Sequence, residues 1–265
     1  MSTAAELAAL LGVGILAGIV STVASLASVV SYPALLALGL QPVSANVTNT
    51  VALMFTAVGA AAGSRPELTG QRRRVLKLGL LTAAGGGAGA ALLLLTPPAG
   101  FEYVAPLLIA VGSLVILRRP VQVAPAADRE TRPDGSARTH GAGDRDSGWL
   151  SRAAIFAVAV YVGYFGAAGG VLMLAVLLRM FRLSLARTNA LKNVILGLAN
   201  AVAGVCFAIF GPVRWAAALP LAAGFLAGGW IGPKIVRKVP AGPFRIVVSL
   251  CGVGLAVMLG ISAYR

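Results

Sequence analysis

A long uncharged stretch near the N-terminus decides the fold class of this chain. Residues 7–64 read LAALLGVGILAGIVSTVASLASVVSYPALLALGLQPVSANVTNTVALMFTAVGAAAGS and contain no Asp, Glu, Lys or Arg. A bilayer core about 30 Å thick needs roughly 20 apolar residues in each spanning helix, so this stretch is long enough for more than one helix. Because it is rich in Ala, Leu and Val and lacks the alternating pattern of a membrane barrel, we expect helices.

The same pattern continues along the rest of the chain. Of its 265 residues, 58% are hydrophobic and only 11% are charged, which is too few charges for the surface of a soluble protein of this length. The first apolar run follows no basic segment and is too long for a cleaved signal peptide. We therefore predict an all-α integral membrane protein. The further uncharged runs are residues 78–101, 103–117, 153–178, 193–213, 215–233 and 246–264.

The distribution of charged and metal-binding residues argues against several other classes of function. The formal net charge is +14, but the basic residues lie at the ends of apolar runs, where the positive-inside rule explains them, so we expect no nucleic-acid partner. The only histidine, His140, lies in a polar segment, and both cysteines, Cys206 and Cys251, lie in apolar runs as small hydrophobic residues. Because neither a set of metal ligands nor a nucleophile–base pair is present, we expect no cofactor, no metal and no enzyme activity.

The acidic residues point to the charge of the cargo. All eight of them lie outside the apolar runs. A carboxylate that could bind a cation or relay a proton inside the membrane is therefore missing, and an anion is the natural cargo. A proton could then travel on the substrate itself, as a weak acid.

A polar segment divides the chain into two similar halves. Residues 118–152 contain seven basic and five acidic residues among Pro, Gly, Asp and Ser, which is typical of a flexible aqueous segment. We predict a first membrane repeat over residues 1–118, a cytoplasmic linker over 119–150 and a second membrane repeat over 151–265. An offset of 141 residues aligns the small-residue patch at 25–29 with that at 166–170, and Thr48 with Asn189. Such internal repeats are typical of secondary transporters.

The basic residues are exchanged between equivalent loops of the two halves. Residues 65–77 contain five basic residues, whereas their counterpart, 211–214, contains one; residues 96–102 contain none, whereas 233–245 contain four. Under the positive-inside rule, the halves then have opposite orientations. Opposite orientation requires an odd number of crossings in each half.

A broken, re-entrant helical hairpin at the start of each half provides that odd number. We place the hairpins at about 5–40 and 153–181, with turns near 24–28 and 166–170. Three spans follow in each half, at about 43–63, 75–95 and 103–118, and at about 188–210, 214–232 and 244–263. Both termini then lie outside the cell and the linker in the cytoplasm. The alternative is eight full spans, which leaves two basic loops on the wrong side.

The two predicted hairpin turns are the first candidate for a substrate site. Small residues let helices break and approach closely, and the half-helix N-termini that result present free N–H groups to an oxyanion. The alternative is ordinary packing of small residues between helices. The candidate residues are Ser25 and Ser28 in the first turn and Gly166, Gly169 and Gly170 in the second.

The second candidate is a polar patch at the start of the long span that follows each hairpin. Ser44 and Ser184 have a simpler interpretation as helix N-caps. The amides lie too far into the helices for that role, and Asn200 lies deeper still. Lys192 would lie about 12 Å along its helix, where it either binds an anion or extends to the interface. The candidate substrate-binding residues of these patches are Asn46, Thr48, Asn49, Asn189, Lys192 and Asn193.

These segments resemble the sulfite exporter TauE/SafE family of membrane transporters. The resemblance rests on GIVSTVASLAS at 18–28, YPALLALGLQP at 32–42 and ANVTNT at 45–50, and on VGYFGAAGG at 162–170 and ARTNALKN at 186–193. One departure is that a turn that is glycine-rich in the family contains Ser25, Ala27, Ser28 and Val29 here. The first turn is then either less broken, or it uses Ser hydroxyls in place of bare backbone. The resemblance implies transport of sulfur-containing oxyanions such as sulfite, thiosulfate or organosulfonates.

We therefore predict a secondary anion permease that spans the inner (plasma) membrane several times. Its expected partners are a small anionic substrate and the lipid bilayer, and the pattern favours no particular oligomeric state, direction of transport or coupling ion. The alternative is a membrane assembly or regulatory subunit that does not transport. Such a subunit would need a docking surface, for which residues 118–152 are the one candidate.

Overall fold

The computed structural model describes residues 4–97, 100–101, 148–166, 169–181 and 183–236, and within these ranges the secondary structure is entirely helical. The predicted all-α class is thereby confirmed. Five of the helices, α1, α3, α5, α9 and α10, are long and apolar enough to cross a membrane, by length and composition. The helices are α1 (Ala4–Ala24), α2 (Ala27–Ala37), α3 (Pro42–Gly63), α4 (Arg65–Leu68), α5 (Arg72–Leu95), α7 (Trp149–Tyr164), α8 (Gly169–Met180), α9 (Leu185–Phe210) and α10 (Trp215–Val236).

The helix boundaries follow the uncharged runs of the sequence closely. Four predicted spans correspond to α3, α5, α9 and α10, and the two predicted hairpins correspond to α1–α2 and α7–α8. Their described turn residues are 25–26 and 165–166, close to the small residues of the predicted turns. The predicted spans 103–118 and 244–263, most of the linker, His140 and Cys251 lie outside the described residues.

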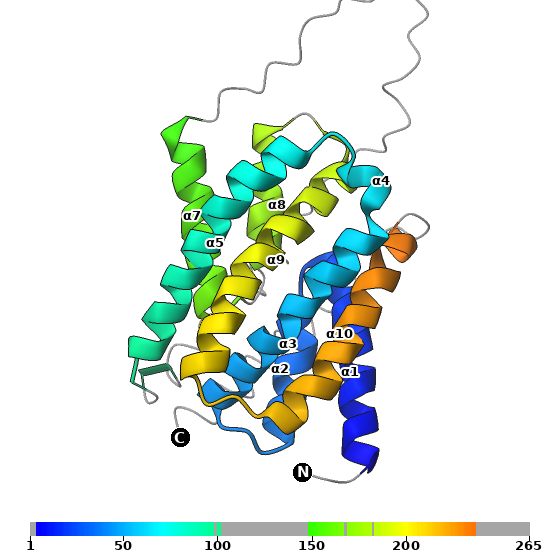
Figure 1. The fold of residues 1–265 in the computed structure, drawn as a ribbon, viewed down its shortest axis with the longest axis vertical. Helices are drawn as coiled ribbons and strands as arrows, with labels where there is room; N and C mark the ends of the chain where they lie inside the picture. Colours follow the sequence, from blue (N-terminus) through cyan, green and yellow to red (C-terminus); the bar gives the residue numbers. More distant parts are fainter. Residues whose placement is uncertain (1–3, 98–99, 102–147, 167–168, 182, 237–265) are drawn as a thin grey trace, which may run out of the picture.

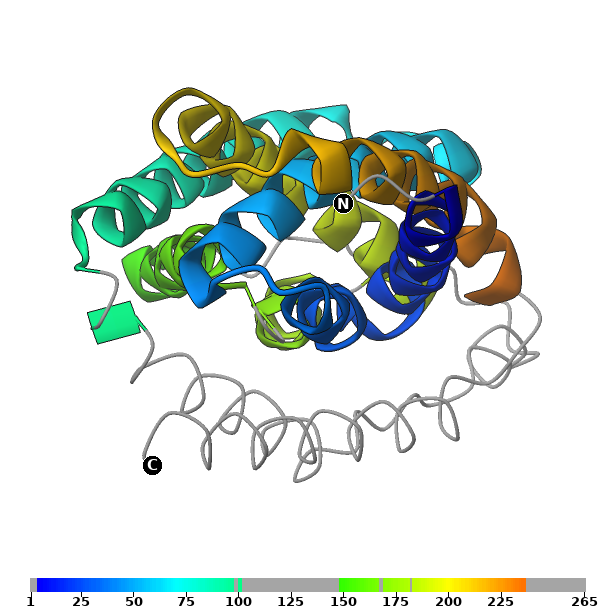
Figure 2. The ribbon, with the colours of Figure 1, turned by 90° about the horizontal axis from the view of Figure 1, so that it is seen from below.

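Two rows of helices build the molecule. The long helices α5, α9, α3 and α10 pack side by side in that order, and α7, α8, α2 and α1 each pack against the corresponding member of that row (Figure 2). With 11 and 12 residues, α2 and α8 are shorter than the roughly 20 residues of a full crossing. This favours the hairpin arrangement over eight full spans.

Helices at equivalent positions in the two halves have equivalent neighbours. The helices α1, α2, α3 and α5 of the first half match α7, α8, α9 and α10 of the second half, in that order. Under this matching, the contact between α1 and α10 is equivalent to the contact between α7 and α5. The contact between α3 and α10 is likewise equivalent to that between α9 and α5. Matched helices also run in opposite directions, most plainly α3 and α9 (Figure 1). This pairing supports the predicted inverted repeat.

Glycines allow the closest contacts between the two halves. Gly14 and Gly18 on α1 face Gly224 and Gly228 on α10, and a Cβ on Gly14 would lie 2.9 Å from Gly224 Cα. On the other side of the molecule, Gly89 on α5 meets α7 in the same way. Small residues four apart let membrane helices pack backbone against backbone. Each hairpin is thus attached to a long helix of the opposite half.

Candidate functional site

The first hairpin turns at a serine in an unusual backbone conformation. Ser25 has φ of +63° and is the one residue other than glycine with positive φ among the described residues. L-residues enter this left-handed region at a cost, because Cβ approaches the carbonyl oxygen. The turn ends α1 and starts α2 at Ala27, and no side chain caps the N-terminus of α2. Free N–H groups at Ala27 and Ser28 therefore begin α2.

The second hairpin turns at Gly166, where φ is +78°. After this turn α8 begins with Gly169 and Gly170, both buried. A Cβ on Gly170 would lie 2.5 Å from Ser25 Cβ, so the two turns meet across the boundary between the halves. A Cβ on Gly169 would instead collide with the Val162 side chain of α7, which gives this glycine a packing role within its own hairpin.

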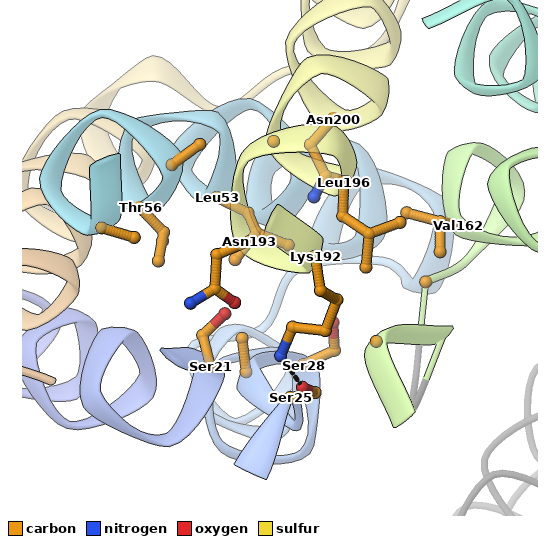
Figure 3. Close-up of a pocket in the computed structure, with 16 residues that line it drawn as sticks. Ser21, Ser25, Ser28, Leu53, Thr56, Val162, Lys192, Asn193, Leu196 and Asn200 are labelled. Atoms are coloured by element: carbon orange, nitrogen blue, oxygen red, sulfur yellow. Dashed lines mark hydrogen bonds between the residues drawn. The ribbon is translucent and has the colours of Figure 1, made fainter. Parts of the chain in front are cut away.

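A cavity of about 60 Å³ opens where the two turns meet α3 and α9 (Figure 3). Its apolar wall includes Leu53, Val162 and Leu196. None of the described residues that line it is acidic. Its polar lining consists of Ser21, Ser25, Ser28, Thr56, Lys192, Asn193 and Asn200, and Gly166 and Gly170 contribute backbone.

Lys192 is the one basic residue among the described residues of the cavity lining and is 1% exposed. Its Nζ donates a hydrogen bond to Ser25 Oγ, so a lysine of the second half contacts the turn of the first (Figure 3). Of the two alternatives for this residue, extension to the membrane interface does not fit such burial. A buried ammonium without a counter-charge is costly, and an anion in the cavity would offset that cost.

Asn49 is connected to the cavity through the hydroxyls of α2. Its side-chain Nδ2 donates to Ser28 Oγ at 3.3 Å, and its Oδ1 accepts from Ser31 Oγ at 2.6 Å. Ser28 lines the cavity, whereas Asn49 lies behind it. Asn49 therefore orients Ser28 in this conformation and has no direct access to a ligand.

Asn46 and Asn189 hold the hairpin ends in place. Asn46 Nδ2 donates to the Tyr164 carbonyl at 3.0 Å, and Asn189 Nδ2 donates to the Thr22 carbonyl at 2.9 Å. Each amide thus comes from the long helix of one half and satisfies a backbone acceptor at the end of the first hairpin helix of the other half. Neither residue lines the cavity.

The equivalent contacts of Asn46 and Asn189 change the alignment of the two halves that the sequence predicted. The offset of 141 residues matched Thr48 with Asn189, whereas the contacts match Asn46 with Asn189, which are 143 residues apart. At the turns the offset of 141 holds, because Ser25 and Gly166 have the positive φ values. The second half therefore has two additional residues between its turn and its long helix.

The remaining polar residues of the patches form hydrogen bonds with backbone groups near the ends of the long helices. Thr48 Oγ1 accepts from Arg214 N at 3.0 Å and does not line the cavity. Ser44 is not an N-cap, because α3 is capped at Gln41; its Oγ donates to the Pro212 carbonyl at 2.8 Å. Ser184 does cap α9, and its side chain accepts from Arg187 N.

Three polar residues of the cavity were not among the predicted binding residues. Asn200 is a deep polar residue in the sequence pattern, whereas Ser21 and Thr56 each lie within an apolar run. A single Ser or Thr in an apolar helix commonly bonds to its own backbone. Thr56 lies two turns beyond Asn49 on α3, and this helical spacing was the signal that could have identified it as a candidate.

One comparison with known proteins gives a match. The sequence profile of a family described as "Sulfite exporter TauE/SafE" matches residues 10–259 of the chain. Neither the search of curated proteins nor that of solved structures gives a match.

Proposed function

The chain belongs to the sulfite exporter TauE/SafE family, and from this membership we propose that it is a secondary transporter of a small sulfur-containing oxyanion such as sulfite, thiosulfate or an organosulfonate. It is a multi-pass membrane protein, and five of its described helices are long and apolar enough to cross a membrane. We propose that it lies in the inner (plasma) membrane and that transport, not enzymatic chemistry, is its activity.

One observation carries the proposal of an anionic substrate. Lys192 is buried in a cavity whose described lining contains no acidic residue, and its hydrogen-bond partner there, Ser25, is neutral. A substrate anion would supply the missing negative charge. The uncapped N-terminus of α2 and the start of α8 add partial positive charge at the same place, which suits an oxyanion.

The size of the cavity favours the smaller members of the substrate class. A water molecule needs roughly 10–15 Å³ in this measure, and the cavity has about 60 Å³. The cavity therefore has room for about four to six non-hydrogen atoms, and sulfite and thiosulfate fall within that range. An organosulfonate with a carbon chain would need the cavity to open further along its apolar wall.

We further propose that the two halves, residues 1–118 and 151–265, are inverted repeats joined by a cytoplasmic linker over 119–150. The equivalent neighbours and opposite directions of the matched helices support this arrangement. With the hairpin turns in contact at the cavity, small movements of one half against the other could expose the site to either side in turn.

Uptake by liposomes tests this function. The full chain would be reconstituted and supplied with sulfite, thiosulfate and organosulfonates in parallel vesicles, with empty liposomes as the control. We expect saturable transport of sulfite or thiosulfate. Absence of transport for every oxyanion would contradict the proposal and favour the alternative of a membrane assembly subunit.

A further inference from the structure

Two polar groups at the cavity have no hydrogen-bond partner within the described residues. These are Thr56 Oγ1 and Asn193 Nδ2, and both atoms are buried. Thr56 is 5% exposed, so bulk water does not compensate for the missing bond. Buried polar groups in proteins are almost always paired, and one without a partner at a cavity indicates a ligand that supplies the bond.

These two residues lie on a different side of the cavity from Lys192. Figure 3 shows Thr56 and Asn193 together near Ser21, whereas the Lys192 side chain extends toward Ser25 and Ser28. Consecutive residues on a helix point about 100° apart, which explains why Lys192 and Asn193 face different parts of the same space. Thr56 comes from α3 of the first half and Asn193 from α9 of the second.

We propose that Thr56 and Asn193 form a second anchoring point, which binds a substrate oxygen that Lys192 does not reach. This inference rests on the proposed function, and it narrows the substrate to an anion with several oxygen atoms that can contact both sides at once. A hydroxyl and an amide N–H both donate to such an oxygen. Because the two donors come from different halves, the bound anion would connect α3 with α9.

The variant Thr56→Val separates this role from a structural one. Valine keeps the shape of threonine but removes the hydroxyl, and in the ligand-free protein that hydroxyl has no partner to lose. We therefore expect an unchanged or higher melting temperature without ligand. The dissociation constant for sulfite should increase roughly three- to tenfold, as for loss of one neutral hydrogen bond.

Thr82→Val is the matched control. Thr82 is fully buried, and its Oγ1 donates to the Ile195 carbonyl at 2.6 Å between α5 and α9, outside the cavity. Removing this hydroxyl breaks a hydrogen bond between α5 and α9, so the melting temperature should fall while sulfite affinity stays that of the unmodified chain. The two threonines are thus expected to give opposite patterns of stability and affinity.

The experiment is sulfite binding by calorimetry on the purified full chain, with thermal melts of the same samples. Asn193→Ala serves as a second variant, with an expected loss of affinity similar to that of Thr56→Val. Unchanged sulfite affinity in both variants, or no sulfite binding by the unmodified chain, would overturn the inference. Because binding is measured apart from transport, a chain that binds sulfite without moving it would contradict only the proposed function.

Discussion

The two halves of the molecule share a fold but contribute different chemistry to the cavity. Each has a hairpin, a turn with positive φ and an asparagine that holds the opposite hairpin. The first half turns at Ser25 and supplies hydroxyls, whereas the second turns at Gly166 and supplies the buried lysine. The shared features determine the arrangement of the helices, and the features that differ line the proposed substrate site.

The first turn has a serine where the second has a glycine, and this difference is related to the position of the lysine charge. Lys192 lies one turn beyond Asn189 on α9, and Asn49 lies one turn beyond Asn46 on α3. The lysine contacts Ser25 across the boundary between the halves, whereas Asn49 contacts serines of its own hairpin. A serine at the first turn therefore serves as an acceptor for the lysine, which a glycine could not do.

The largest effect should come from filling the contact between the turns. Gly170→Leu would place a side chain where even a Cβ lies 2.5 Å from Ser25 Cβ, and we expect complete loss of transport by protein that still inserts into the membrane. Gly12→Leu is the control, because a Cβ there meets no atom within 4 Å. Uptake into liposomes, corrected for the amount of inserted protein, measures both. Normal transport by Gly170→Leu would show that the turns need not touch.

The next effect should come from the charge in the second half. Lys192→Ala removes a charged hydrogen-bond donor, worth roughly 1.5–3 kcal/mol, so the concentration for half-maximal transport should rise about ten- to hundredfold. Lys192→Arg should retain part of the affinity. Asn49→Ala, at the matching position of the first half, should have a smaller effect because Asn49 lies behind Ser28. Equal effects of Lys192→Ala and Asn49→Ala would contradict the proposed difference between the two halves in anion binding.

The smallest effect should come from the two asparagines that the halves share. Asn46→Ala and Asn189→Ala each remove one bond to a hairpin carbonyl, and such bonds between membrane helices contribute about 0.6 kcal/mol, up to roughly 1.7. We expect similar, modest decreases in melting temperature for both variants. A much larger decrease for one of them would mean that the two contacts are not equivalent.

The sequence predicts the positions of the helices better than it predicts the partners of their polar residues. Runs without charge and clusters of small residues are local features, so α3, α5, α9 and α10 and both turns fall where expected. The role of Asn46 depends on Tyr164, which is far away in the chain and becomes a neighbour only through packing of the halves.

The register of the repeat and the Thr56 site were harder to predict for the same reason. Ala and Gly are so frequent that they align at almost any offset, and the two additional residues of the second half leave no clear mark in the sequence. Thr56 resembles many threonines that bond to their own helix. Its missing partner becomes visible only when α3, α9 and the first turn are placed together.

The glycine contact between α1 and α10 has a consequence for biogenesis. Ribosomes make the chain from its N-terminus, so Gly14 and Gly18 enter the bilayer long before Trp215–Val236 emerges. Until then, the face of α1 that later packs against α10 borders lipid or another temporary neighbour. Insertion and final packing are therefore separate stages, because α1, the first of the described helices to be synthesised, packs against the last of them, α10.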